Sequence, residues 1–270
     1  MDGTLRAAGV FFAAAMIALG VTGVVNGDFA LVWQNVPAEV PGRTALAWLC
    51  AIVELATGIG LLLRPTLAAA SRILFPYMLL WLVLLKVPGL VHAPRDVGSW
   101  GGFGEIGAMT AGAWCLFASL AGKREERHPG WAVGANGIRA ARGLLVIVLP
   151  LLGIEVIVDA VRAGDRVMQP WLQHLPHPMA WACLTGLGSI ATCLALLFGV
   201  WPRFAATIEA AMVVVIGVVY WGPDLGTGRT ATTAFIITLL VAAGIWVVAD
   251  TYRHQPWFVT GRPVWKAEAG

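Results

Sequence analysis

Charge is what this 270-residue sequence has least of. Asp, Glu, Lys and Arg make up only 12% of the residues, whereas a soluble domain has about 25%. Hydrophobic residues reach 59%, and the mean hydropathy is +0.78. The net charge of +3 is too small for a nucleic-acid-binding surface. This composition excludes an ordinary soluble domain and predicts a protein of the lipid bilayer with no nucleic-acid partner.

Motifs for cofactors are also missing. The sequence has no metal-ligand spacing, no HExxH and no glycine-rich loop for a phosphate or a flavin. No pair of histidines lies within the apolar runs to hold a haem. We therefore expect no metal, haem or flavin cofactor. The cysteines form no CxxC pair and fit small buried hydrophobes in apolar runs: Cys50, Cys115, Cys183 and Cys193.

Long apolar runs are what the sequence does contain. A run of about 20 such residues is long enough to cross a bilayer as a helix. The runs lack the alternation of barrel strands, so the predicted class is an all-α membrane protein. We expect eight spans: Ala7–Val25, Thr44–Leu63, Thr66–Val91, Phe103–Ala121, Gly143–Val161, Pro178–Val200, Phe204–Trp221 and Thr230–Asp250.

An internal repeat organises these spans. The stretch Gly27–Arg64 recurs as Gly164–Arg203, with Gly-Asp, Trp, Leu/Val-Pro, Ala-Trp and an apolar run in the same order. The offset is roughly 133 to 139 residues, and Gly20 matches Gly153. Two tandem, parallel four-helix bundles are therefore predicted. The divisions are a first unit at 1–121, a cytoplasmic linker at 122–142, a second, diverged unit at 143–250 and a cytoplasmic tail at 251–270.

Lys and Arg are distributed unequally over the two ends of the spans. With both termini on the inner side, twelve of these residues lie inside and six outside. Cytoplasmic loops carry the excess of Lys and Arg, so a cytoplasmic N-terminus and C-terminus are predicted. Because each half has an even number of spans, the units are parallel rather than inverted as in many secondary transporters.

Two outer segments combine aromatic residues with prolines. Phe29–Pro41 and Val167–Pro178 are too short to span the membrane and too apolar for free loops. We expect each to lie at the outer interface as a short helix or turn, with Trp33 and Trp171 at headgroup depth. Simple interfacial anchoring without a ligand is the alternative.

Three ionisable residues fall in or beside apolar runs of the first half. Glu54 is near the middle of the second span, Lys86 follows thirteen uncharged residues after Arg72, and Glu105 opens the predicted fourth span. Such residues are costly in a membrane and are candidates for function. As alternatives, Glu54 pairs with Lys86 or a neighbouring helix, Lys86 extends to the headgroups, and Glu105 starts a helix.

The second half does not repeat these residues. Leu187 and Pro223 stand near the positions that match Glu54 and Lys86, and its own acids Glu155 and Asp159 lie on a different helix. We therefore predict an outward-opening pocket in the first half and treat the second half as scaffold. The candidate pocket residues are Trp33, Gln34, Glu54, Lys86, His92 and Glu105.

The first half resembles the DoxX-like family of small bacterial membrane proteins. The residues that carry this resemblance are ALGVTGVVNGDFALVWQNVPAEVPGR, LLLRPT and LLWLVLLKVPGLVHAPRDVGSWGGFGE. It covers residues 6–121, and residues 139–250 look like a diverged second copy. The resemblance implies a four-helix bundle in the bacterial cytoplasmic membrane. Founding members are similar to a small subunit of a thiosulfate:quinone oxidoreductase, and no catalytic residues carry over.

Three functions fit these observations. The first is a non-catalytic, auxiliary or anchor subunit of a quinone-linked redox system, whose pocket holds a quinone headgroup or docks a membrane or periplasmic redox protein. In that case Lys86 or His92 donates a hydrogen bond to a quinone carbonyl. The second is a carrier or binding protein for a small hydrophobic or anionic molecule, contacted by Glu54 and Lys86. The third is a structural membrane protein whose charges are merely paired.

Overall fold

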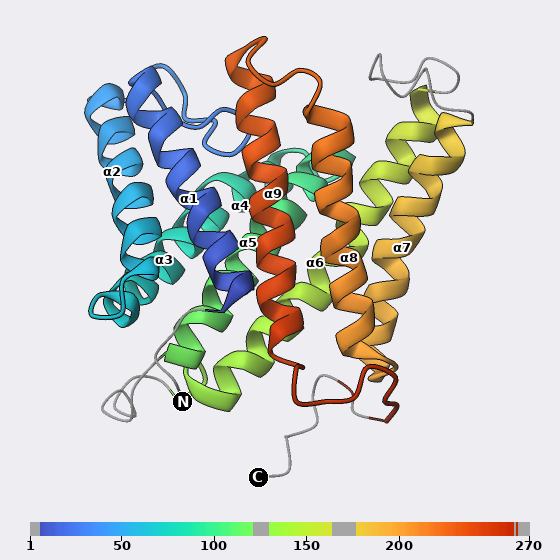
Figure 1. The fold of residues 1–270 in the computed structure, drawn as a ribbon. Helices are drawn as coiled ribbons and strands as arrows, with labels where there is room; N and C mark the ends of the chain where they lie inside the picture. Colours follow the sequence, from blue (N-terminus) through green and yellow to red (C-terminus); the bar gives the residue numbers. More distant parts are fainter. Residues whose placement is uncertain (1–5, 121–129, 164–176, 262, 264–270) are drawn as a thin grey trace.

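The structure is a computed structural model that describes residues 6–120, 130–163, 177–261 and 263. The described part is helical and contains no strand, and eight of its helical segments are long and apolar enough to cross a membrane (Figure 1). The prediction of an all-α protein with eight spans is confirmed.

The first half contributes four spans, and the third of them is built from three consecutive pieces. A π-helix, η1, joins α3 to α4 without breaking the span. The bounds are α1 Ala7–Asn26, α2 Arg43–Leu62, α3 Leu67–Trp81, η1 Leu82–Lys86, α4 Val87–His92 and α5 Val97–Leu120.

The second half repeats this order, including the π-helical turn at the end of its third span. Proline at the first helical position starts α7 and α8, and Gly199 ends α7 with a φ of 68°. The bounds are α6 Gly134–Ala163, α7 Pro178–Phe198, α8 Pro202–Ile216, η4 Gly217–Trp221 and α9 Arg229–Asp250.

Two helices begin well before the residues at which the sequence predicts them, by more than a full turn. Helix α5 starts at Val97 rather than Phe103, because the Asp96 side chain accepts hydrogen bonds from the Ser99 amide and hydroxyl, both at 2.8 Å. Glu105 therefore lies inside α5 and does not open it. Helix α6 starts at Gly134 rather than Gly143, so part of the predicted linker is helical. The preceding linker residues through 129 and the segment 164–176, including Trp171, lie outside the described residues.

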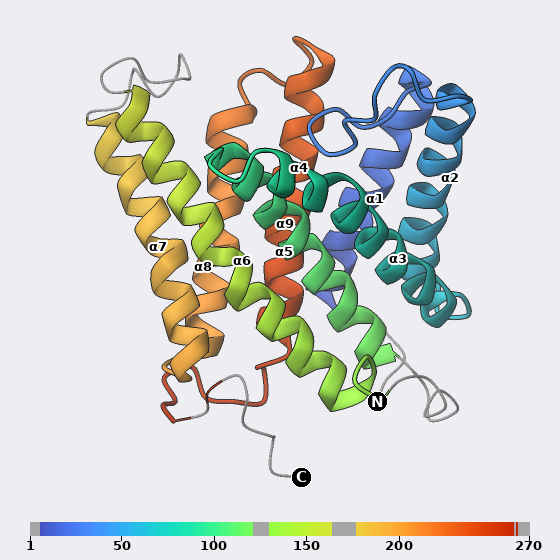
Figure 2. The same cartoon turned by 180° about the vertical axis from the view of Figure 1, so that it is seen from behind.

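The two halves interleave. Within each half, consecutive spans pack against one another in chain order. Across the halves, α9 packs against both α1 and α5, and α5 also packs against α6 (Figures 1 and 2). In the predicted repeat, α1 matches α6 and α5 matches α9, so the contact of α1 with α9 is equivalent to the contact of α6 with α5. The crossing of α5 with α9 joins these two helix pairs. Two tandem bundles as separate units stay a prediction.

Glycines permit the central crossing of α5 and α9. Gly112 and Gly244 are each the sixteenth residue of their helix. A Cβ atom on Gly112 would lie 2.4 Å from the Cα of Gly244, and one on Gly244 would lie 2.5 Å from the Ala108 carbonyl oxygen. The two backbones thus touch with no side chain between them, as in close helix pairs of membrane proteins.

The beginning of α1 and the end of α9 lie at the same end of the molecule, where Arg6 Nε is 3.7 Å from Asp250 Oδ2. The chain after α9 is held there by Arg142 of α6, which donates to the Thr251 hydroxyl and carbonyl at 2.8 Å and stacks on Tyr252. We call this the tail end. The opposite end, where the segment 27–42 joins α1 to α2, is called the Asp28 end.

The glycine crossing can be tested by adding a single methyl group. We expect Gly112→Ala to destabilise the protein by about 2–4 kcal/mol, because overpacking must separate two backbones. Thermal unfolding in detergent, followed by size-exclusion chromatography, measures the change. Gly143→Ala in α6 is the matched control, since a Cβ there meets no atom within 4 Å. Equal unfolding temperatures for the two variants would contradict the crossing.

Candidate functional site

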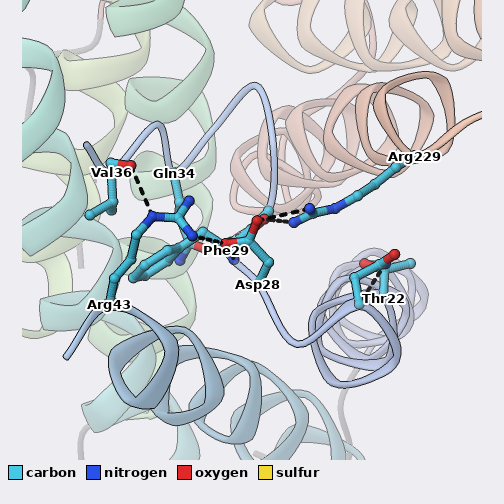
Figure 3. Close-up of polar contacts among 9 residues, drawn as sticks. Thr22, Asp28, Phe29, Gln34, Val36, Arg43 and Arg229 are labelled. Atoms are coloured by element: carbon cyan, nitrogen blue, oxygen red, sulfur yellow. Dashed lines mark hydrogen bonds and ion pairs between the residues drawn. The ribbon is translucent and has the colours of Figure 1, made fainter. Parts of the chain in front are cut away.

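An aspartate joins two arginines at the Asp28 end. The Asp28 carboxylate accepts hydrogen bonds from Arg43, the first residue of α2, and from Arg229, the first residue of α9, the latter at 2.9 Å. Arg229 also donates to the Phe29 carbonyl. Figure 3 shows the two arginines reaching Asp28 from opposite sides. We call Asp28, Arg43 and Arg229 the clasp.

The clasp fixes the segment between α1 and α2. Arg43 additionally donates from Nε to the Val36 carbonyl at 3.3 Å and lies 5.2 Å from the centre of the Phe29 ring. Burial raises the pKa of Asp28, but hydrogen bonds from Arg229, the Phe29 amide and Arg43 outweigh it and hold this pKa below its ordinary value of 3.8. The carboxylate is therefore ionised at neutral pH and ties the segment 27–42 to both α2 and α9.

Trp33 of this segment points into the first half. Trp33 is buried with 1% of its surface exposed and packs edge-on against Tyr77 of α3. Val32 has a φ of 72°, which is strained for a β-branched residue. The clasp and this turn direct the indole into the protein, so Trp33 is not an exposed interfacial anchor, and its headgroup depth stays a prediction.

Gln34 connects the segment to the middle of the membrane region. Its amide nitrogen donates to Glu54 Oε1 at 3.0 Å and to the Tyr77 hydroxyl at 2.8 Å, and Tyr77 donates to Glu54 Oε1 at 2.8 Å. The side-chain oxygen Oε1 of Gln34 accepts a hydrogen bond from the main-chain amide of Ala30 at 3.1 Å. Glu54 is thus paired with neutral groups and not with Lys86.

A pocket of about 330 Å³ opens beside Trp33. Its walls come from the segment 27–42, from the third span and from the start of α5. The lining residues are Trp33, Asn35, Leu85, Lys86, Gly89, Asp96, Gly98 and Ser99. Hydrogen bonds from the Ser99 hydroxyl and amide lower the pKa of Asp96, so a cation and an anion share this pocket.

Lys86 lies over the glycine-rich start of α5. A Cβ atom on Gly102 would be 3.0 Å from the Lys86 ammonium nitrogen. Lys86 is within electrostatic range of Glu105 in α5 and Glu155 in α6. Within the described ranges, no acid lies within 4 Å of this ammonium group to form an ion pair.

Glu155 brings the second half to this site. A Cβ on Gly101 would lie 1.6 Å from Glu155 Oε2, so the carboxylate occupies space that only glycine leaves free. The interleaving of α5 with α6 places it there. The second half is therefore more than a scaffold for this site.

The six predicted pocket residues divide into separate places. Trp33 and Lys86 line the pocket, and Glu105 lies near Lys86. Gln34 and Glu54 form the hydrogen-bonded network with Tyr77. His92 is exposed, and its Nδ1 lies 2.7 Å from the Pro88 carbonyl of its own helix.

Sequence reasoning missed several residues that matter here. Asp28 and Arg229 are 201 positions apart, so nothing local pairs them. Glu155 was assigned to the second half, although the glycine pair at 101–102 is a sequence signal for a side chain lying on α5. Glu209 of α8 is 1% exposed and accepts hydrogen bonds from Ser189 at 2.6 Å and Thr192 at 3.3 Å.

These observations define a class: a multi-pass helical membrane protein with a polar pocket at one end and buried carboxyl groups in its spans. Comparisons with protein-family models, curated proteins and solved structures found no match to the chain.

The clasp predicts a specific dependence of stability on pH. Asp28→Asn should lower the free energy of unfolding at pH 7 by about 1–2 kcal/mol, because it removes a charge-assisted contact between segments. The pKa of Asp28 is depressed in the fold, so its contribution is complete above the ordinary value of 3.8 and disappears as the pH falls through the lower folded value. Melting curves of both proteins should therefore converge in that acidic range.

The control for this experiment is Glu39→Gln, which removes the same charge from an exposed position of the same segment. We expect Glu39→Gln to melt like the parent protein at pH 7. A constant difference between Asp28→Asn and the parent down to pH 2 would contradict the clasp.

Proposed function

We propose that the pocket binds the polar head of an apolar small molecule, and that this molecule is a quinone. In this proposal the protein is an auxiliary or anchor subunit of a quinone-linked redox system, as the resemblance to DoxX-like proteins implies. The observation that carries the proposal is Lys86: a half-buried ammonium group on the pocket wall without a direct ion pair among the described residues.

The surroundings of the pocket favour a ligand that enters from lipid. Val83, Leu84 and Val91 on the third span are 49%, 55% and 71% exposed. On a membrane-spanning helix, exposed apolar side chains face the hydrocarbon. An apolar tail can lie along this face while the head occupies the pocket beside Lys86.

The charges favour a neutral acceptor over an anion. Pairwise electrostatic interactions connect the pocket residues Lys86 and Asp96 with one further cation and three further acids: Arg162, Glu105, Glu155 and Asp159. An anion would meet an excess of acids, whereas a quinone carbonyl accepts a hydrogen bond without adding charge. The Lys86 ammonium is the donor, and a quinone therefore fits the pocket better than the anion that a carrier would bind.

The proposed setting is the bacterial cytoplasmic membrane. The excess of Lys and Arg at the tail end supports a cytoplasmic location for both termini. The pocket at the Asp28 end then opens outward, where a periplasmic or membrane redox protein can reach it.

Purification from native membranes at endogenous level tests the physiological role. Mass spectrometry of the co-purifying proteins and of the lipid extract should identify a stoichiometric oxidoreductase and a retained quinone. A protein that purifies alone with bulk lipid only would overturn the assignment to a redox system.

Binding of a short-tailed ubiquinone analogue tests the pocket itself. We expect Lys86→Met to weaken binding roughly tenfold or more, since a hydrogen bond to a charged group contributes about 1.5–3 kcal/mol. Equilibrium dialysis of the detergent-solubilised protein measures the affinity. Arg95→Met is the matched control, because Arg95 is an exposed cation of the neighbouring loop. Equal affinities for the two variants would exclude Lys86 as the donor.

A further inference from the structure

We propose that Glu54 and Glu209 are proton-binding sites, one in each half, and that both carboxyl groups hold a proton at neutral pH. This inference does not depend on the pocket or on a quinone. It rests on where the two carboxyl groups lie and on which groups surround them.

Both carboxyl groups are removed from solvent and from cations. Glu54 and Glu209 are each 1% exposed. Among the described residues, neither has a Lys, Arg or His within ion-pair distance. An ionised carboxylate without a partner is very costly in such surroundings, and holding a proton removes that cost.

The two groups occupy equivalent places. Each lies between the second and third spans of its half: Glu54 reaches Tyr77 from α2, and Glu209 reaches Ser189 and Thr192 from α8. Helical rise places Glu54 about 17 Å from the Asp28 end of α2 and Glu209 about 18 Å from the same end of its span. The carboxyl group thus sits at similar depth although it comes from different helices.

Hydrogen-bond donors at Glu54 argue against a metal cation there. Gln34 Nε2 and the Tyr77 hydroxyl both donate to Oε1. An amide N–H cannot coordinate a cation, so this oxygen is set up to accept hydrogen bonds. Oε2 has no donor among the described residues and can carry the proton.

Hydroxyl groups surround Glu209. Ser189 lies 2.6 Å from Oε1, a direct hydrogen bond that leaves no room for an ion between the two oxygens. Thr192 lies 3.3 Å from Oε2. Hydroxyl groups donate to or accept from a neutral carboxyl equally well. The site therefore suits a proton in the same way as Glu54.

In the described part of the structure, few other titratable groups lie near these two carboxyl groups. Cys50 of α2 and Tyr77 of α3 are close to Glu54, and α1, which packs on α2, contains none. Around Glu209, α7 contributes Cys183 and Cys193 as its titratable residues, and α9 carries charge only at its ends.

One of the sites is connected to the Asp28 end. Gln34 belongs to the segment that the clasp holds and that supplies Trp33 to the pocket wall. Movement of this segment would remove a donor from Glu54 and open it toward that end. The geometry thus links the proton at Glu54 to the state of the pocket.

Infrared spectroscopy of the full-length protein in lipid tests the proposal. At pH 7 the parent protein should show the carbonyl stretch of protonated carboxylic acids, shifted on exchange into D₂O. The band should weaken in Glu54→Gln and in Glu209→Gln and weaken further in the double variant. Glu39→Gln, which removes an exposed acid, should leave the band unchanged. A band that is absent at pH 7, or unchanged in both single variants, would overturn the proposal.

Two further measurements keep the test decisive if a variant fails to fold. Dicyclohexylcarbodiimide, which reacts with protonated carboxyl groups in apolar surroundings, should label Glu54 and Glu209 of the parent protein at pH 7, as located by peptide mass spectrometry. Labelling should be the same in sodium and choline buffers. Absence of label at both residues would refute the proposal, and protection by sodium would replace the proton with a metal cation.

Discussion

The close crossing of α5 and α9 holds the last helix of the second half against the first half. At Gly112 and Gly244 the two backbones touch, which draws α9 between α1 and α5. The first residue of α9, Arg229, then meets Asp28, and the packing of α6 on α5 brings Glu155 to Gly101. A wider crossing would move α9, and with it Arg229, away from Asp28 and so would open the clasp. Two small residues therefore help to hold Arg229 of the second half beside Asp28 of the first.

The protein treats its ionisable groups differently at different depths. At the Asp28 end, where water is near, opposite charges pair directly in the clasp. Within the spans, the donors that Glu54 and Glu209 find among the described residues are all neutral. Lys86 lies between these extremes, near Glu105 and Glu155 but without an ion pair to an acid in the described part of the chain. This gradation follows the falling solvation of charge toward the membrane centre, where paired ions and bare ions are both costly.

The apolar runs determine the eight helices, because a backbone in lipid has few other ways to satisfy its hydrogen bonds. The sequence could not place the start of α5, since the cap at Asp96 overrides a glycine-rich stretch of low helix propensity. In the structure Lys86 and Trp33 line one pocket, whereas Glu54 and His92, which the sequence analysis groups with them, lie elsewhere. Helical periodicity says which face of a helix is apolar and not which helix covers it, so Glu155 and Arg229 could not be assigned to the first half.

The two matched helix pairs have acquired different chemistry. Aligning Gly20 with Gly153 pairs Glu155 with Thr22, and aligning Gly112 with Gly244 pairs Gly101 with Thr233. Where α6 meets α5, the side chain of Glu155 lies against Gly101. At the matched positions α1 and α9 carry threonines, Thr22 and Thr233. Identical copies would have to carry the same residue in both places. Because both halves belong to one chain, matched positions can carry different residues. The pair α5–α6 therefore contributes an acid near the pocket, while Arg229 of α9 and Asp28, which follows α1, join the other pair in the clasp.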